Sequence, residues 1–496
     1  AINDGKNKLK WFPHNDGGSL RKWYGNRSSI INWQFDGKEI KALKNSTIRN
    51  EQYYFKTGVT WTDISSSYFA ARFLPSGSVF ENTGSIVIVE DKDLLQVLGF
   101  LCSVVAKAIM DMMNPTIHYG VGEVSRLPVS DNIPKKEIGR IAEKCIKLEN
   151  YDWNSYETSW DFTSLPLLHS DYRQPTLEVT YTQLRANLRN MTLEMQRLEE
   201  ENNRIFLKAY GLQDELTPDV PLSEITLTCN PHYRYNGNKT EEELEALLLT
   251  DTIKELISYA IGCMMGRYSL DRPGLIYANS GNEGFDPSKY KIFPADDDGI
   301  IPIMDQNWFP DDATNRFVEF LKVAWPPEHL DENLKFIADS LKPKNNEAPI
   351  DTILRYLSVS FFKDHLKTYK KRPIYWLFSS GKQKAFECLV YLHRYNETTL
   401  PRMRSNYVTP LQGKFNARLD YLRTEEDTLD TASAKKKIQK KIDALKKKQA
   451  ELSAFDIELR HYADMKISLD LDDGVKVNYG RFGNLLAEKK AVTGKK

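Results

Sequence analysis

The sharpest hydrophobic pattern in the chain lies between Tyr181 and Leu212. Inward-facing positions recur there at alternating intervals of four and three residues, at Leu184, Leu188, Met191, Met195, Leu198, Asn202, Ile205, Ala209 and Leu212. This spacing predicts a long helix with a heptad seam, and an ordinary core helix is the alternative. Asn202 falls at an inner position, where a polar side chain can determine register, and Gly211 is expected to end the helix.

A second long helical pattern runs from Lys435 to Arg460. Its inner positions repeat the same spacing at Ile438, Ile442, Leu445, Gln449 and Leu452, and eight lysines lie between Lys435 and Lys448. We interpret these lysines first as a solvated face over an apolar seam, with phosphate contact as the alternative. We expect this helix and the one ending at Leu212 to pack antiparallel as a spacer.

Shorter patterns predict the remaining elements. The alternating run Ser85 to Val89 predicts a strand, and the acids after it favour a helix that continues to Met113 before Asn114-Pro115. Because Gln96, Lys107 and Asp111 interrupt the apolar stretch Leu94 to Met113, it predicts a buried amphipathic helix and not a membrane span. Another helix is expected from Thr240 to Met265.

These patterns predict an α+β protein, and 496 residues suggest about three domains. We divide the chain into an α+β module, a linker with a helical spacer, an acidic mixed α/β segment, and a basic aromatic-rich region with the Lys-rich helix, over residues 1–130, 131–215, 216–350 and 351–496. The net charge of zero hides this polarity. Residues 361–423 hold thirteen bases against four acids, and residues 211–351 hold twenty-six acids against twelve bases. The basic region is a candidate polyanion surface.

The cysteines argue against a disulfide framework or a structural zinc site. They are scattered without a C-x-x-C pair, and no histidine pair has metal-ligand spacing; the five are Cys102, Cys145, Cys229, Cys263 and Cys388. A reducing, cytoplasmic location is therefore expected, and no signal peptide or membrane association is predicted. The absence of an initiator Met suggests a piece of a longer reading frame.

Candidate catalytic motifs fail on spacing or context. Asn230-Pro231-His232-Tyr233 is similar to the N-P-P-[YF] loop with which amino-methyltransferases hold a flipped base, but His232 replaces a proline. No upstream strand ends in the glycine turn that a nucleoside cofactor needs, so a structural strand-to-turn segment is favoured. The acids Asp296, Asp297 and Asp298 lack calcium-loop spacing and suggest a solvated loop. We expect no catalytic, cofactor-binding or metal residues, and no catalysis by this chain alone.

Features of nucleic-acid binding are stronger. Two stretches mix cations, hydroxyls and aromatic rings, as surfaces that contact phosphates and base edges do. The first predicted DNA-contact surface consists of Lys56, Thr57, Trp61, Arg72 and Ser76. The second consists of Lys371, Arg372, Lys382, Lys384, Arg402 and Arg404. For any single member, a solvated charge beside an aromatic core is the alternative.

Several of these segments resemble known proteins. Residues 58–61, 85–88 and 98–103, with Pro115-Thr116-Ile117-His118-Tyr119 and residues 122–129, resemble the target-recognition domain of restriction-modification proteins. Later runs are similar to the carboxy-terminal half of the PglX family, the adenine-specific DNA methyltransferases of BREX phage-defence systems. These runs are residues 201–206, Tyr268-Ser269-Leu270-Asp271-Arg272-Pro273-Gly274, Arg372-Pro373-Ile374-Tyr375-Trp376 and residues 473–479.

The resemblance implies that the parent protein transfers a methyl group from S-adenosylmethionine to the N6 of adenine in a non-palindromic site. The cofactor and its catalytic loop would belong to an upstream methyltransferase domain, with no cofactor in this chain. The implied partners are double-stranded DNA, that upstream domain, other BREX subunits and phage DNA-mimic inhibitors. The alternative function is a scaffold that docks other defence subunits and binds little DNA itself.

Overall fold

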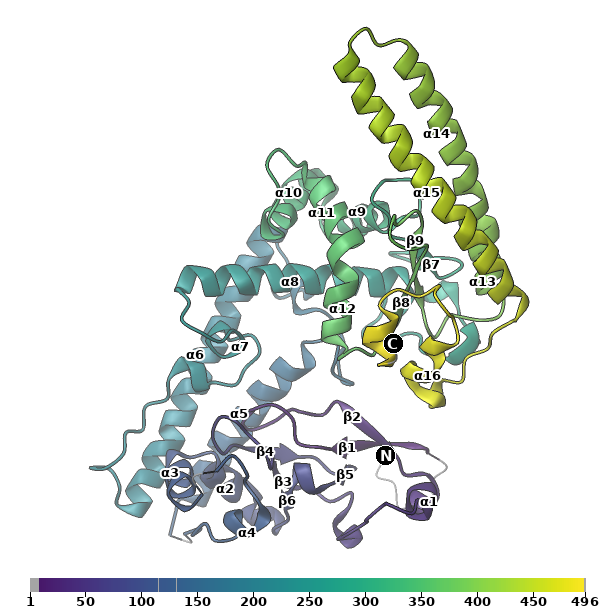
Figure 1. The fold of residues 1–496 in the computed structure, drawn as a ribbon. Coiled ribbons are helices and arrows are strands. Elements are labelled where there is room, and N and C mark those ends of the chain that lie inside the picture. The colour runs from purple at the N-terminus through teal and green to yellow at the C-terminus, as the bar shows by residue number, and fades with distance from the viewer. Residues whose placement is uncertain (1–8, 115, 131, 495–496) are drawn as a thin grey trace. The chain divides into compact units, whose positions relative to one another are not determined.

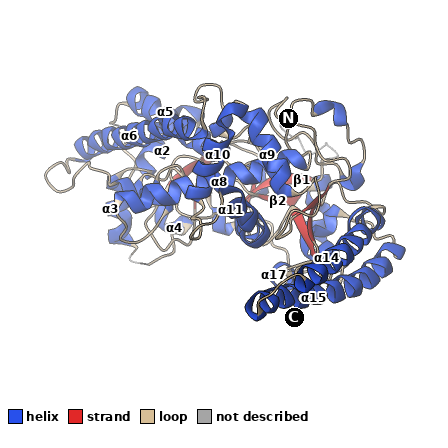
Figure 2. Ribbon diagram, turned by 90° about the horizontal axis from the view of Figure 1, so that it is seen from above, coloured by secondary structure: helices blue, strands red, loops and turns tan. Residues whose placement is uncertain are grey.

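The structure is a computed structural model that describes residues 9–114, 116–130 and 132–494. The chain forms two compact units: unit 1 comprises residues 1–162 and 182–248, and unit 2 comprises residues 163–181 and 249–496. The predicted mixed α+β class is confirmed, with helices predominating over short strands (Figure 1, Figure 2). The boundaries of the four sequence segments differ from those of these two units, and the four-segment division stays a prediction.

Two three-stranded sheets form in unit 1. One has the order β2-β1-β5, with β1 (Trp11–Asn15) antiparallel to β2 (Ser29–Asn32) and parallel to β5 (Val79–Phe80). The other has the order β4-β3-β6 and is antiparallel, from β3 (Gly58–Trp61), β4 (Ala71–Leu74) and β6 (Ile86–Val87). Between β2 and β3 lie α1 (Gln34–Ala42) and the short turn η1 (Glu51–Tyr53), and η2 (Asn82–Gly84) precedes β6. The expected strand over residues 85–89 is therefore reduced to β6.

The helix expected up to Met113 is divided in two. It consists of α2 (Asp91–Leu101) and α3 (Val104–Met113), which are bent by 68°. The break has a local cause, since Ser103 caps α3 by accepting a hydrogen bond from the amide of Ala106 at 3.2 Å. Met113 ends the helix as expected, whereas Pro115 lies outside the described residues. Within the described part, no single helix is long and apolar enough to span a membrane, although α2 and α3 together meet that length and composition test.

The heptad seam lies in the helical core of unit 1, which agrees with the alternative of an ordinary core helix. The predicted long helix is confirmed as α6 (Leu177–Tyr210), and Gly211, at φ +69°, follows its end. The seam joins the same core as α2 and α5 (Lys135–Asn154). Asn202 is fully buried and donates from Nδ2 to the Gly99 carbonyl at 2.9 Å, so it ties α6 to α2. The remaining short helices of unit 1 are α4 (Val121–Val124), η4 (Leu222–Glu224) and α7 (Pro231–Arg234).

The predicted helix from Thr240 is confirmed as α8 (Glu241–Met264), whose carboxy-terminal part belongs to unit 2. Unit 2 contains an antiparallel sheet of order β7-β9-β8, formed by β7 (Ile300–Pro302), β8 (Tyr375–Ser379) and β9 (Glu387–Tyr391). Between the two edge strands β7 and β8 the chain forms α9 (Ala313–Ala324), α10 (Leu330–Ser340), α11 (Pro349–Tyr356), the π-helical η8 (Leu357–Phe361) and α12 (Phe362–Thr368). After β9 come α13 (Thr399–Arg402), the π-helical η9 (Met403–Val408), α14 (Thr409–Asp427), α15 (Ala432–Asp464), α16 (Gly474–Gly480) and α17 (Lys489–Thr493).

The Lys-rich helix exists as predicted, but its expected partner is wrong. α15 lies along α14 as a helical hairpin (Figure 1). The buried positions of α15 include Ile438, Ile442 and Leu445, and those of α14 are Leu411, Phe415, Leu419 and Leu422. The two helices are joined by only four residues, so bringing them together costs little chain entropy. The pairing with α14 buries the apolar seam of α15 that we had expected to pack against the helix ending at Leu212.

Candidate nucleic-acid interface

A buried ionic network holds the start of unit 1 against its helices. Arg21 donates from Nη1 to Glu149 at 2.8 Å and lies 3.4 Å from Asp152, while Lys22 pairs with Glu199, and all five side chains are at most 6% exposed. Burial raises the pKa of Glu149 to about 8 against the pull of Arg21. For Lys22, burial alone would lower the pKa, but Glu199 raises it above its ordinary value. The network fixes the segment after β1 to α5 and α6.

Two members of the first predicted surface lie inside unit 1. Trp61 is 1% exposed and donates from Nε1 to the Tyr119 carbonyl at 2.6 Å. Arg72 is also 1% exposed, and it donates to Thr62 Oγ1 at 3.2 Å and to the Gly17 carbonyl at 3.3 Å. Burial and the nearby charge of Arg21 lower the pKa of Arg72 to about 10, so it is still protonated at neutral pH. Both side chains support the strands from within.

The other three members are brought together at the surface. Lys56 and Ser76 are exposed and Thr57 is half-buried. Two backbone hydrogen bonds join their loops, from Gly77 N to Phe55 O at 3.0 Å and from Phe55 N to Ser78 O at 2.9 Å. Gly77 has a φ of +96°, a conformation that side chains disfavour, so glycine suits this turn. The Lys56 ammonium lies 5.3 Å from the centre of the Tyr53 ring.

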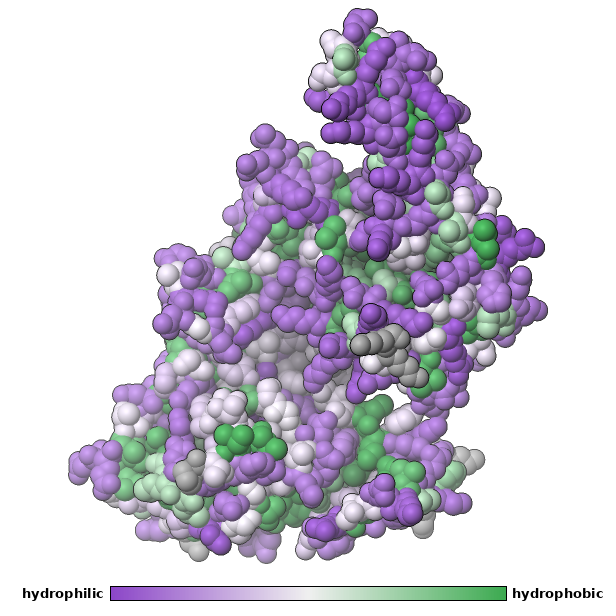
Figure 3. Space-filling model, in the orientation of Figure 1, coloured by the Kyte–Doolittle hydropathy of each residue, from purple (hydrophilic) through white to green (hydrophobic). Residues whose placement is uncertain are grey.

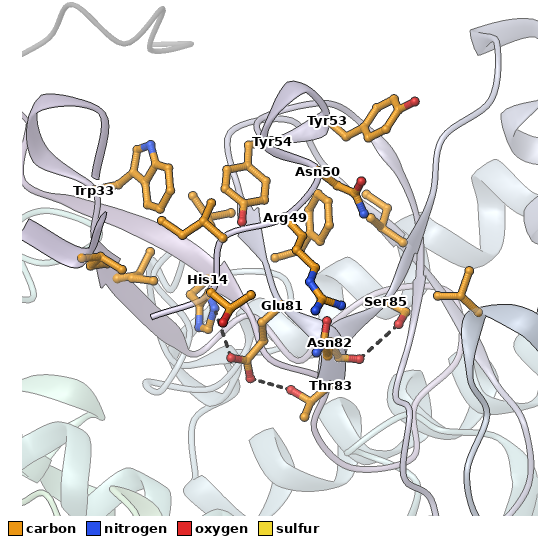
Figure 4. Close-up of a pocket in the computed structure, with 18 of the residues that line it drawn as sticks. His14, Trp33, Arg49, Asn50, Tyr53, Tyr54, Glu81, Asn82, Thr83 and Ser85 are labelled. Atoms are coloured by element: carbon orange, nitrogen blue, oxygen red, sulfur yellow. Dashed lines mark hydrogen bonds and ion pairs between the residues drawn. The ribbon is translucent and has the colours of Figure 1, made fainter. Parts of the chain in front are cut away.

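Beside these loops lies a pocket of about 890 Å³ that sequence reasoning did not identify (Figure 4). Its aromatic wall includes Trp33, Tyr54 and Phe80, with Tyr54 edge-on to Trp33 at 5.1 Å and to Phe80 at 5.0 Å between ring centres. Exposed Arg49 and Asn50 also line it. These residues come from three separate stretches of the chain, so only a signal of tertiary contact could have found the pocket.

The second predicted surface, in unit 2, contains three freely exposed cations. Lys371 and Arg372 follow α12 in a tight turn, and Lys382 lies in the loop between β8 and β9. Lys370 and Lys371 both adopt left-handed φ angles, 49° and 63°, which are uncommon for residues with a Cβ. The Lys371 amide donates to the Leu366 carbonyl at 2.7 Å, which stabilises this turn.

The other three members already have partners within unit 2. Lys384 pairs with Glu387 at 2.9 Å, and Arg404 pairs with Asp456 at 2.7 Å. Arg402 is half-buried and has one long hydrogen bond to Asn396, at 3.4 Å. Their side chains are therefore less available than those of Lys371, Arg372 and Lys382.

The segment similar to a methyltransferase loop is structural in geometry. Asn230 is fully buried, and its amide donates to the carbonyls of Leu222 at 2.7 Å and Ile225 at 2.8 Å. Its Oδ1 accepts from the His232 amide at 3.2 Å and caps α7. The Tyr233 hydroxyl donates to the Leu20 carbonyl. An amide with its donors occupied in this way is not available to hold a base.

The described residues do not fit S-adenosylmethionine. A nucleoside cofactor needs a glycine turn between a strand and the next helix, where the backbone can approach closely. The strand-to-helix connections β2–α1, β6–α2, β7–α9 and β9–α13 contain no glycine. The one parallel strand pair among the described residues, β1 with β5, is two residues long. Among the described residues, no group of three or more His, Cys, Asp or Glu side chains is arranged so that it could hold a metal ion.

Comparison with known proteins places the chain. No family model matches it. It is 46% identical over 504 aligned residues to the adenine-specific methyltransferase BrxX of Escherichia coli O9:H4 (strain HS), covering 99% of this chain and 41% of that protein. It is 38% identical over 485 residues to the adenine-specific methyltransferase PglX of Lacticaseibacillus casei (strain Zhang), covering 95% of this chain and 38% of that protein. The chain thus spans about two fifths of the curated relatives it matches, and it is homologous to that part of the BrxX and PglX adenine-specific methyltransferases.

Proposed function

We propose that the chain is the DNA target-recognition portion of a BREX-type adenine-N6 DNA methyltransferase. The observation that carries the proposal is the match to BrxX over 99% of this chain but 41% of the relative. The strand-to-helix connections of this portion do not suit the cofactor. We therefore assign the portion to another task of the methyltransferase. Selecting the DNA site is the task that its exposed cations serve.

The proposed contacts follow from exposure. In unit 1, Lys56, Thr57 and Ser76 would approach the duplex, and Trp61 and Arg72 would hold β3 and β4 beneath them. In unit 2, Lys371, Arg372 and Lys382 would contact phosphates, with Lys384, Arg402 and Arg404 contributing only where they exchange their present partners. Phosphate contacts would supply most of the affinity, and side chains at base edges the specificity.

In the parent protein, S-adenosylmethionine would supply the methyl group and would be bound by residues outside this chain. The role of the present residues would be to bind and orient duplex DNA, so that a chosen adenine is presented for transfer. Other BREX subunits and acidic DNA-mimic inhibitors are further proposed partners, since a cationic surface attracts both DNA and its mimics.

Fluorescence anisotropy of the 496-residue chain with duplex DNA tests the proposal. We expect binding that weakens steeply with salt, and a preference for some duplexes over others in a randomised pool. Lys371→Glu with Arg372→Glu should weaken binding at least tenfold, because two phosphate contacts become repulsive. The matched control is Lys342→Glu with Lys344→Glu, the same charge change at exposed positions of the acidic segment.

Two outcomes would contradict the proposal. One is equal binding to every duplex, which would remove the recognition role. The other is the absence of DNA binding together with stable capture of other defence subunits, which would favour the scaffold function.

A further inference from the structure

We infer that the hairpin of α14 and α15 is a sequence-independent DNA-backbone contact, which rests on the proposed function for its ligand. In this hairpin the Lys-rich helix α15 lies along α14. Hydrophilic residues cover most of the hairpin surface that Figure 3 shows. Three observations carry the inference: unpaired lysines, their arrangement around the helix, and the fixed geometry of the hairpin.

Seven lysines of α15 have no partner among the described residues. All seven are exposed, and none of their side chains makes a hydrogen bond, an ion pair or a ring contact; they are Lys435, Lys436, Lys437, Lys440, Lys441, Lys446 and Lys447. Lys448, by contrast, pairs with Asp305 at 2.7 Å. The one acid between Lys435 and Lys448, Asp443, accepts from Gln439 at 2.8 Å and from no lysine among the described residues. These ammonium groups are therefore available to pair with the negative groups of a polyanion.

Three of these lysines form a row on the outside of the hairpin. Lys436, Lys440 and Lys447, here called the lysine row, lie four and seven residues apart, so they share one face of an α-helix. With a rise of about 1.5 Å per residue, the row is about 16 Å long. It lies opposite the seam of Ile438, Ile442 and Leu445, which is buried on α14. The apolar seam therefore directs the row outwards.

The neighbouring part of α14 strengthens the positive field. Gln449 donates to Asn416, so the middle parts of the two helices lie beside each other. Residues 414–423 and 440–448 together contain eight Lys or Arg and two Asp. One of these two acids, Asp420, pairs with Arg423 at 3.1 Å. Four further acids lie at the connection between the helices, at Glu425, Glu426, Asp427 and Asp430, so α14 adds positive charge only along the middle of the hairpin, and Lys436 is the member of the lysine row nearest to these acids in sequence.

The hairpin is held as a defined element and not as a loose tail. Arg404, in η9, donates two hydrogen bonds to Asp456 of α15. Glu451 of α15 accepts from Ser380 Oγ at 2.8 Å and from the Gln383 amide at 2.7 Å, in the loop between β8 and β9. A row of cations on a fixed helix loses less conformational freedom on binding than a flexible basic tail. Duplex DNA, with regularly spaced phosphates and no need for base contact, is the partner that fits.

The test is the salt dependence of DNA binding by the full chain. Lys436→Gln, Lys440→Gln and Lys447→Gln are combined, which removes three charges without adding repulsion. The slope of log K against log salt should fall by about 0.9 for each lost contact, hence by up to about 2.7. The reduction should be the same for every duplex, because phosphates carry no sequence information.

A matched control separates this effect from net charge. Lys136→Gln, Lys144→Gln and Lys147→Gln change three exposed lysines of α5 and remove the same charge from unit 1. The control should keep the wild-type slope. Circular dichroism should show both variants folded, since all six positions are exposed. A Lys-to-Arg version of the lysine row should retain the slope, because it keeps the charges.

The outcomes separate this inference from the proposed function. An unchanged slope for the lysine-row variant overturns the inference, even when preference among duplexes persists, and leaves these lysines for an acidic protein partner. A reduced slope without any preference among duplexes supports the hairpin contact and removes the recognition role. Equal loss in the α5 control, or no binding by the wild-type chain, also overturns the inference.

Discussion

Arg404 and Asp456 form a two-point ion pair, with Nε to Oδ1 at 2.7 Å and Nη2 to Oδ2 at 3.0 Å. The pair joins η9 to α15, and hydrogen bonding to Asp456 raises the pKa of Arg404 above its ordinary value. Parallel hydrogen bonds from a guanidinium fix geometry as well as charge. A residue predicted to contact DNA therefore has a structural role at the base of the hairpin.

The Arg404 pair yields a prediction that distinguishes structure from DNA contact. Arg404→Ala and Asp456→Ala should each lower the free energy of unfolding by about 0.5–1 kcal/mol, because the Arg404 side chain is 38% exposed and screened by solvent. A double-mutant cycle in urea should give a coupling energy of similar size. If Arg404 also contacts a DNA phosphate, Arg404→Ala should lower the DNA affinity and Asp456→Ala should not. Equal effects on affinity would leave Arg404 a purely structural role.

Removing one partner of the Lys22–Glu199 pair should lower the free energy of unfolding strongly, whereas replacing both partners should lower it much less. Both side chains are at most 5% exposed, and Glu199 also accepts from Trp23 Nε1 at 2.9 Å. Lys22→Met should destabilise unit 1 by about 3–5 kcal/mol, because it leaves a buried carboxylate without its cation. Adding Glu199→Gln, which keeps an acceptor for Trp23, should recover much of this loss. Thermal denaturation of the single and double variants measures both, and an additive loss would contradict the pairing.

His365 predicts acid sensitivity of unit 2. It is buried, its Nε2 accepts from the amides of Ile374 and Tyr375 at 3.1 Å each, and burial and the charge of Arg267 lower its pKa to about 3. The unfolded state, with a pKa near 6.5, then binds the proton more readily. The stability that neutral His365 contributes is present above about pH 6.5 and is lost as the pH falls towards 3.

The slope of that loss can be measured. One proton taken up on unfolding corresponds to about 1.4 kcal/mol per pH unit. Urea unfolding of the wild type between pH 4 and 7 should show this contribution, and His365→Gln, whose side chain can accept a hydrogen bond but does not titrate there, should remove it. An identical pH profile for the two proteins would show that His365 is not the responsible group.

Gly99 and Asn202 make the helix junction intolerant of an added methyl group. A Cβ on Gly99 would lie 2.7 Å from Cγ2 of Ile138 and 3.0 Å from Oδ1 of Asn202. Gly99→Ala should therefore destabilise unit 1 by about 1–3 kcal/mol despite the better helix propensity of alanine. Gly139→Ala on α5, where the nearest atom is 3.8 Å away, is the control and should be neutral or stabilising. The melting temperatures of the two variants, each compared with that of the wild type, test this prediction.

Local patterns in the sequence determined the long helices. The 4-3 spacing predicted α6 and α15, Gly211 marked the end of α6, and Asn202 was recognised as an inner polar residue. These features depend on helical periodicity and on a glycine that adopts positive φ, both of which are properties of neighbouring residues. The family resemblance also followed from sequence alone, and the comparisons confirm it.

Only the tertiary structure decided which side chains face solvent and which helices pair. Arg72 and Trp61 belong to a polar, aromatic stretch typical of a binding surface, yet both are buried, because every position of β3 is buried and the two side chains lie on opposite, covered faces of the β3–β4 pair. The same heptad pattern fits any apolar helix, so it could not show that α15 packs on α14. Pairing depends on loop length and on which apolar faces meet, and exposure depends on contacts between residues far apart in sequence.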